Sequence, residues 1–351
     1  MATGGRKRFS RGDVTIHNAD VLHLYEEWEP PVVIVSDGAY GISGFPGDPP
    51  TAEEVASWYE PHIKKWSEKA TPLTTLWFWN REIGWANVHP LLDKYGWEYI
   101  SCNVWDKGIA HIAGDSNVNV LRRFPQVTEV CVHYIKRAEF KVKDRVARMQ
   151  EWLRLEWERT ELPQSKANEA CGVKNAATRK YLTKDHLWYF PPPKRFGKLV
   201  EYANRYGNPN GRPYFFIDGK KPFTEQEWAK MRPKFYCELG VTNVWGHPPL
   251  HDEERLKEDG RAGKAIHLNQ KPLQLIELTI KASSDKKDVI WEPFGGLCTA
   301  AIASHKLGRS CYSAEIDEKI YEIAVQRLQN YDKREAERIR IKGFRAYRSL
   351  E

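Results

Sequence analysis

The sequence lacks any apolar run long enough to cross a membrane. A transmembrane helix needs about 18 or more consecutive apolar residues, and no stretch of the 351-residue chain approaches that length. The first residues, Met-Ala-Thr-Gly-Gly-Arg-Lys-Arg, also lack the apolar segment of a secretory signal peptide. We therefore expect a cytoplasmic protein with no membrane partner.

The cysteines show no pattern typical of a zinc site or a disulfide framework. There are six, and no two of them have the C-x-x-C spacing. We expect buried free thiols and no metal. The six are Cys102, Cys131, Cys171, Cys237, Cys298 and Cys311.

Extreme composition is absent as well. A hydrophobic content of 41% over 351 residues can build a proper core, in one large domain with an insertion or in two domains. The net charge of +7 is moderate, with basic clusters at 6–8 and 333–348. Such clusters can neutralise phosphates, but solvated basic tails would look the same. Charge alone does not establish a nucleic-acid partner.

Hydrophobic patterning divides the chain into three parts. From Val14 to Arg137 short apolar runs alternate with helical periodicity, and the same alternation resumes at Ala265. The two outer parts are most simply halves of one twisted, mostly parallel sheet with helices on both faces. We expect strands at 32–36, 73–79, 97–105, 128–135, 288–291 and 310–315, and helices at 52–69, 87–95, 273–282, 298–307 and 318–331.

The middle part has a different character. Charged helical periodicity predicts a helix from Asp144 to Thr160, with Val146, Met149, Leu153 and Trp157 on its apolar stripe. Residues 162–182 divide at Cys171-Gly172 into two short helical segments, which is typical of a helix-turn-helix but equally of an ordinary helical hairpin. In the first case 173–182 is the reading helix. Its polar positions are then Lys174, Asn175, Thr178, Arg179 and Lys180.

A glycine turn near the carboxyl terminus is the most informative stretch. The run Trp291-Glu292-Pro293-Phe294-Gly295-Gly296 follows a predicted strand, a helix begins near Thr299, and the next strand ends at Glu315. Glycines let the backbone approach a nucleotide-like ligand, and an acid about 20 residues on can hold a ribose diol. The spacing departs from the dinucleotide fingerprint G-x-G-x-x-G.

A second cluster lies in the first part of the chain. The strand predicted at 32–36 leads into Asp37-Gly38-Ala39-Tyr40. This places an acid and an aromatic side chain at the carboxyl end of a strand, where open α/β sheets bind their ligands. Taken alone, Tyr40 would be a plain core aromatic.

Together these elements resemble the motifs of S-adenosylmethionine-dependent DNA amino-methyltransferases. Asp37 to Tyr40 resembles the catalytic motif D/N/S-P-P-Y/F/W, and Glu292 to Gly296 with the upstream His267-Leu-Asn-Gln-Lys271-Pro272 resembles the cofactor motifs. The order, with the catalytic motif first and the cofactor motif last, is that of the β group of these enzymes. The resemblance covers about 14–137 and 264–330 and implies a Rossmann-like methyltransferase fold.

The resemblance also implies roles for individual residues. Asp37 and the Gly38 carbonyl would accept hydrogen bonds from the target amino group, which favours a more pyramidal nitrogen and stabilises its developing positive charge. Tyr40 would stack on the flipped base, and Glu315 would hold the ribose. The cofactor-binding set is Asp20, Lys271, Glu292, Pro293, Phe294, Gly295, Gly296, Thr299 and Glu315, and the DNA-binding set is Lys174, Asn175, Thr178, Arg179 and Trp105.

Three positions depart from the family pattern. Gly38-Ala39 replaces the two prolines, so the loop must be held by packing. Leu297-Cys298 stands where Ser-Gly is usual. Glu292 replaces the common aspartate and shifts the carboxylate by one methylene.

The predicted organisation is a catalytic domain in two parts, 1–137 and 264–351, around a largely helical target-recognition insertion at 138–263. The predicted function is site-specific methylation of double-stranded DNA with S-adenosyl-L-methionine, with N6-adenine slightly favoured because aspartate opens the motif. N4-cytosine methylation is the first alternative and a non-catalytic DNA-binding protein the second. Methylation of RNA or of a small molecule ranks last, and a cognate restriction endonuclease stays an open partner.

Overall fold

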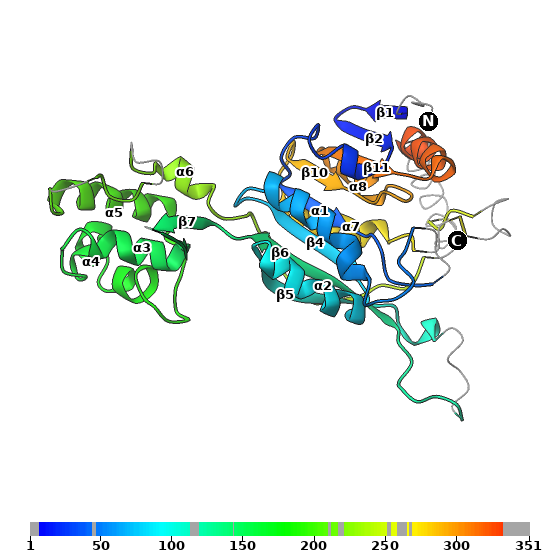
Figure 1. The fold of residues 1–351 in the computed structure, drawn as a ribbon, viewed down its shortest axis with the longest axis horizontal. Helices are drawn as coiled ribbons and strands as arrows, with labels where there is room; N and C mark the ends of the chain where they lie inside the picture. The colour runs from blue at the N-terminus through cyan, green and yellow to red at the C-terminus, as the bar shows by residue number, and fades with distance from the viewer. Residues whose placement is uncertain are drawn as a thin grey trace, which may run out of the picture. The chain divides into compact units, whose positions relative to one another are not determined.

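The computed structural model divides the chain into two compact units. One comprises Met1–Lys136 and Lys234–Glu351, here the sheet unit, and the other Arg137–Pro233, here the insertion unit (Figure 1). The structure describes residues 7–43, 47–112, 119–142, 144–209, 212–216, 221–250, 254–257, 265–266 and 269–332. The motif residues His267 and Leu268 and the basic cluster 333–348 lie outside them. Among the helices described, none is long and apolar enough to cross a membrane.

The sheet unit is built on a nine-stranded sheet. In spatial order its strands are β1 (Lys7–Arg11), β2 (Val14–Asn18), β11 (Ser310–Glu315), β10 (Val289–Glu292), β3 (Val33–Ser36), β4 (Thr75–Asn80), β6 (Thr128–Lys136), β5 (Trp97–Asp106) and β9 (Val244–Gly246). Its helices are η1 (Val21–His23), α1 (Val55–Lys69), α2 (Glu82–Lys94), η2 (Ile109–His111), α7 (Leu273–Ser283), α8 (Thr299–Leu307) and a helix over 318–332. The predicted α/β fold with its mostly parallel sheet is confirmed.

Strand direction decides which residues meet at the site. Among the described strands five neighbouring pairs are parallel and three are antiparallel. Strands β2, β3, β4, β10 and β11 therefore end at one edge of the sheet. Strand β6 runs against β4, with Asn80 opposite Val130, so it begins at that same edge.

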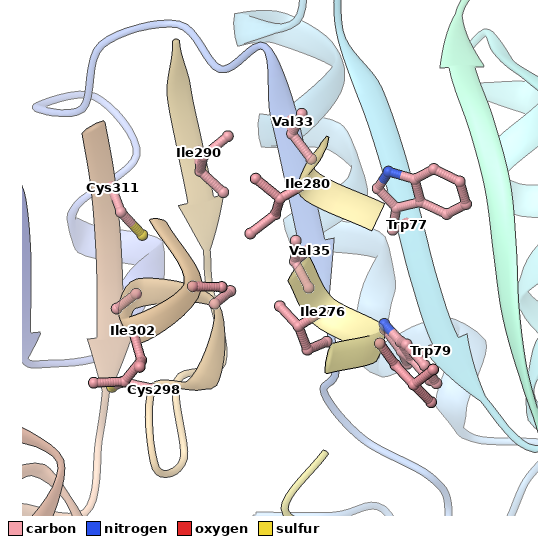
Figure 2. Close-up of a cluster of buried hydrophobic side chains, with 14 of the residues drawn as sticks. Val33, Val35, Trp77, Trp79, Ile276, Ile280, Ile290, Cys298, Ile302 and Cys311 are labelled. Atoms are coloured by element: carbon pink, nitrogen blue, oxygen red, sulfur yellow. The ribbon is translucent and has the colours of Figure 1, made fainter. Parts of the chain in front are cut away.

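Helices cover both faces of this sheet because side chains alternate along each strand. Val33 and Val35 of β3 pack with α7, α8 and residues 318–332, and Figure 2 shows Ile276 and Ile280 of α7 against these valines. Ile34 points to the other face and packs with η1, α1 and α2. The β3 turn that follows is thus anchored from both sides.

The amino-terminal basic cluster extends partly into the sheet. Strand β1 pairs with β2 in antiparallel register, and Lys7 forms ion pairs with Glu318 and Glu322 of the helix over 318–332. The alternative of a solvated tail therefore does not hold for Lys7. Strand β1 was not predicted, because three of its five residues are basic and it has no apolar run.

The insertion unit begins with a β-hairpin where a helix was predicted. It contains β7 (Glu139–Val142), β8 (Arg145–Arg148), α3 (Met149–Glu158), α4 (Lys166–Cys171), η3 (Ala177–Tyr181), α5 (Pro193–Tyr206) and α6 (Glu225–Ala229). The helix predicted from Asp144 is wrong in its first turn, and Val146 of the expected stripe is 56% exposed. Period-two alternation explains this, since Phe140 and Ala147 face each other in the hairpin and are both buried.

The candidate reading helix is shorter than predicted. Gly172 ends α4 in the left-handed conformation, with φ of 62°, which fits the expected division there. Only Ala177–Tyr181 is then helical, with π geometry. Residues 234–250 pair or pack with the sheet unit, through β9 beside β5, so the insertion unit is more compact than the segment 138–263.

Candidate active site

A cavity of about 610 Å³ lies at the edge where the parallel strands end. Turns after β2, β3, β10 and β11 line it, together with one side of α1. All nine expected cofactor residues and two of the three expected catalytic residues line it. The motif residues in the wall are Asp20, Asp37, Gly38, Lys271, Glu292, Pro293, Phe294, Gly295, Gly296, Thr299 and Glu315.

The turn after β3 is held in place by three hydrogen bonds rather than by prolines. The Gly38 N–H donates to the Tyr59 hydroxyl at 3.1 Å, and the Asn80 amide donates to the Ala39 carbonyl at 2.9 Å. The Tyr40 N–H donates to the carboxylate of Asp48 at 3.0 Å. These contacts supply the constraint that the missing prolines would otherwise give.

Gly38 is also the residue that the space around this turn requires. A Cβ atom at this position would lie 2.6 Å from the Phe294 ring and 2.7 Å from the Tyr59 hydroxyl. A proline would meet the same ring and would lack the N–H that Tyr59 accepts. Glycine in place of proline at residue 38 therefore leaves room for the ring of Phe294.

Asp37 presents its carboxylate to the cavity. Its Oδ1 atom accepts from the Tyr40 hydroxyl at 2.8 Å and from the Lys271 ammonium at 2.8 Å. Among the described residues no donor engages the Gly38 carbonyl. Both acceptors expected for an amino group are thus at the same turn.

Tyr40 lies beneath Asp37 rather than in the cavity wall. Its side chain is only 4% exposed, and burial raises the pKa of its hydroxyl well above the ordinary value. The Lys271 ammonium stands 5.0 Å from the centre of its ring. A cation therefore already lies over the ring that was expected to stack on a base.

Glu292 lines the cavity, but both of its oxygens accept hydrogen bonds from the surrounding fold. Its two oxygens accept from the N–H groups of Ala300 and Ala301, at 2.6 and 3.0 Å, and from the Ser313 hydroxyl at 2.8 Å. The longer side chain of glutamate thereby reaches the first turn of α8. Burial raises its pKa to about 7 although these donors favour the carboxylate.

The remaining acids stand where a nucleoside could be held. Glu315 accepts from the Gly296 N–H at 2.7 Å, and burial raises its pKa. Asp20 accepts from the Leu22 N–H at 2.9 Å at the end of β2. Each carboxylate is oriented by a backbone donor and retains acceptor capacity.

The aromatic side chains that pack on Phe294 were not predicted. Phe294 packs against Trp58 and His62 of α1, with ring centres 5.0 and 4.9 Å apart. Burial lowers the pKa of His62 to about 4, so it is neutral at pH 7. The only sequence signal was the i, i+4 spacing of Trp58 and His62, which puts both on one helix face.

The expected DNA-binding residues are divided between the two units. Trp105 is buried, and its indole N–H donates to the His247 carbonyl at 2.6 Å. In the insertion unit Lys174, Asn175 and Arg179 are exposed. The Thr178 hydroxyl is bonded to Asn168 and to the Asn175 carbonyl, so it supports the local fold.

Glu129 is the acid that sequence reasoning missed. It is the second residue of β6, and its Oε2 atom lies 3.3 Å from both the Lys271 ammonium and the Tyr40 hydroxyl. Lys107 is paired with its other oxygen. Only the antiparallel direction of β6 brings it to the site, and strand direction is not visible in hydrophobic patterning.

Comparisons with known proteins give a family match over most of the chain. Residues 28–326 match the family model for N6 and N4 methyltransferases, described as DNA methylase. The chain is 28% identical over 166 residues to the type II methyltransferase M.ScaI of Streptomyces caespitosus, covering 46% of this chain and 48% of that protein. It is 33% identical over 87 residues to M.HinfI of Haemophilus influenzae, covering 25% and 24%. The chain thus spans about a quarter to a half of these relatives.

A solved structure shows a distant likeness as well. The PvuII DNA methyltransferase, described as cytosine-N4-specific, is 12% identical with a TM-score of 0.47, covering 90% of this chain and 93% of that one. The family match extends through both motif turns and the whole insertion unit. On that match, this chain belongs to the DNA methylase family of N6 and N4 amino-methyltransferases.

Proposed function

We propose that this protein transfers a methyl group from S-adenosylmethionine to an exocyclic amino group of a base flipped out of double-stranded DNA. One observation carries the proposal: Asp37 and the carbonyl of Gly38 stand at one turn, in the wall of the cavity that Asp20 and Glu315 also line. An amino-group acceptor pair and a nucleoside-holding pair thus share one cavity.

Asp37 and Gly38 would act on the amino nitrogen. Accepting one N–H at the carboxylate and the other at the carbonyl turns the nitrogen lone pair toward the methyl donor and stabilises the charge that develops. Asp37 is also placed to take the proton that the nitrogen gives up. Position and electrostatics then account for the catalysis, and no covalent intermediate on the protein is required.

The cavity fits the proposed cofactor. Phe294, Trp58 and His62 supply an aromatic wall for a purine, and Glu315 and Asp20 supply acceptors for ribose hydroxyls and an adenine amino group. Gly295 has no room for a side chain, since a Cβ there would lie 2.8 Å from the Ser313 hydroxyl. When bound, S-adenosylmethionine supplies a methyl group on a sulfonium.

The insertion unit would contact DNA. Residues 137–233 contain 21 lysines and arginines against 12 aspartates and glutamates, a net charge of +9, which leaves −2 for the rest of the chain. Positive charge confined to one unit suits phosphate contacts. Lys174, Asn175 and Arg179 are the exposed candidates for this surface.

Labelled methyl transfer to unmethylated genomic DNA, followed by nucleoside mass spectrometry, tests the proposal. Asp37 favours N6-methyladenine as the product, and N4-methylcytosine would assign the other base while keeping the reaction class. The matched variant is Asp37→Ala, which should transfer no methyl group. Absence of label in DNA, with cofactor binding intact, would leave a non-catalytic DNA-binding protein as the better account.

A further inference from the structure

A largely buried cluster of two cations and two carboxylates includes Asp37 of the proposed acceptor pair. Lys271 is 2% exposed and lies between Asp37, at 2.8 Å, and Glu129, at 3.3 Å. Glu129 is itself 14% exposed and is also paired with Lys107, which is 12% exposed. The four charges balance, which is the condition under which such groups can be buried.

The charges hold one another in the ionised form. Burial alone would lower the pKa of Lys271, but Asp37 and Glu129 raise it above its ordinary value. Burial would likewise raise the pKa of Glu129, but Lys271 and Lys107 bring it below its ordinary value. Lys271 therefore stays an ammonium near neutral pH.

The Lys271 ammonium contacts the same two groups, Asp37 and Tyr40, that the proposed function assigns to the target base. It donates to the Asp37 carboxylate and stands 5.0 Å from the centre of the Tyr40 ring. A base cannot use either contact fully while Lys271 remains there. Its positive charge would also oppose the charge that develops on the amino nitrogen during transfer.

We propose that Lys271 is a displaceable occupant of the target-amino position and that Glu129 receives it when the base enters. This inference rests on the proposed function. The ammonium leaves Asp37 for a carboxylate that it already approaches, so it is never left without an anionic partner. Glu129 is then a positioning residue, which acts on the base through Lys271, and Lys107 keeps Glu129 ionised.

The decisive variant is Glu129→Gln. With no receiving charge, Lys271 stays on Asp37, and we expect the KM for DNA to rise about tenfold. The fluorescence of a 2-aminopurine or pyrrolocytosine placed at the methylated position of a duplex should fall, because the base is flipped less often. Cofactor affinity should stay within about twofold of the parental value. Glu60→Gln, which breaks an exposed ion pair with Lys94, is the matched control and should change none of these.

Adding Lys271→Met to Glu129→Gln separates this role from a structural one. The double variant removes one cation and one anion, and loss of the occupant should restore the base-flipping signal toward the parental value. If Lys271→Met deepened the defect instead, or if Glu129→Gln left the KM for DNA unchanged or lost the cofactor, the inference would be overturned. A parental protein that methylates no DNA would overturn the proposed function instead.

Discussion

Two turns of the same kind meet at the cavity and use their carboxylates in opposite ways. Both follow a parallel strand, β3 or β10, and both place an acid within a residue of the strand end. Glu292 is held by three donors from α8 and β11, whereas Asp37 is held by the side chains of Tyr40 and Lys271. An acid that is held mainly by backbone donors supports the fold, whereas an acid paired only with side chains can exchange partners with a ligand.

The two turns are also packed on each other. Phe294 of the second turn fills the space beside Gly38 of the first, and Tyr59 of α1 contacts both. The first turn lacks the two prolines of the motif, and packing against the second turn restricts its conformation instead. The following predictions test this division between chemistry and support.

Asp37→Asn should affect activity far more than stability. The substitution keeps the shape but removes the charge that stabilises the developing cation, so we expect kcat to fall about 1000-fold. The free energy of unfolding should fall by roughly 1 to 3 kcal/mol, because the buried charges no longer balance although Lys271 keeps Glu129 as a partner. Single-turnover methyl transfer and urea denaturation measure the two quantities. A large loss of stability would assign Asp37 to the fold and remove the contrast.

Glu292→Ala should lower the free energy of unfolding more than Asp37→Asn does. It leaves two N–H groups at the start of α8 and the Ser313 hydroxyl without their acceptor, at a cost of roughly 3 to 5 kcal/mol. Urea denaturation of the parental and variant proteins gives the difference. A variant with parental stability but no methyl transfer would move Glu292 to the chemical side of the comparison.

The raised pKa of Glu292 predicts a pH dependence for its contribution to stability. Its folded value is about 7, against 4.5 for the free side chain. The stabilisation by the protonated form is therefore complete below pH 4.5 and is lost as the pH rises to about 7. Measured against Glu292→Gln, which cannot titrate, the free energy of unfolding should fall by up to about 3 kcal/mol over this range. A flat difference would mean that the helix donors outweigh burial.

The contrast between the two turns shows which features of the site could be predicted from the sequence and which could not. The sheet, its helices and the two acid-bearing turns were predictable, because hydrophobic periodicity gives elements and glycine gives turns. The role of Glu292 was not, because its donors come from α8 and from Ser313 of a separate strand. Tertiary structure, and not the local sequence, determines which of the two acids accepts hydrogen bonds from the backbone.

Errors elsewhere have the same origin. Strand β8 was taken for the first turn of a helix because Val146, Met149 and Leu153 also fit helical spacing, and only the pairing of Phe140 with Ala147 shows that it is a strand. In the same way the sequence gives no sign that Glu156 of α3 is buried, where it accepts from the Phe215 N–H. Partners distant in sequence decided each case.

Gly38→Ala tests the packing that joins the two turns. The added Cβ would lie 2.6 Å from the Phe294 ring, so the ring or the turn must shift, at a cost of about 2 kcal/mol. Phe294→Leu in the same chain removes that ring and should return most of the lost stability, giving a coupling of about 1 kcal/mol or more in a double-mutant cycle. Gly246→Ala, at an open position of the sheet unit without positive φ, is the control for adding a Cβ without a clash. Additive effects of the two substitutions would show that the turns are built independently, and the first turn would then need another source of the rigidity that its prolines would have supplied.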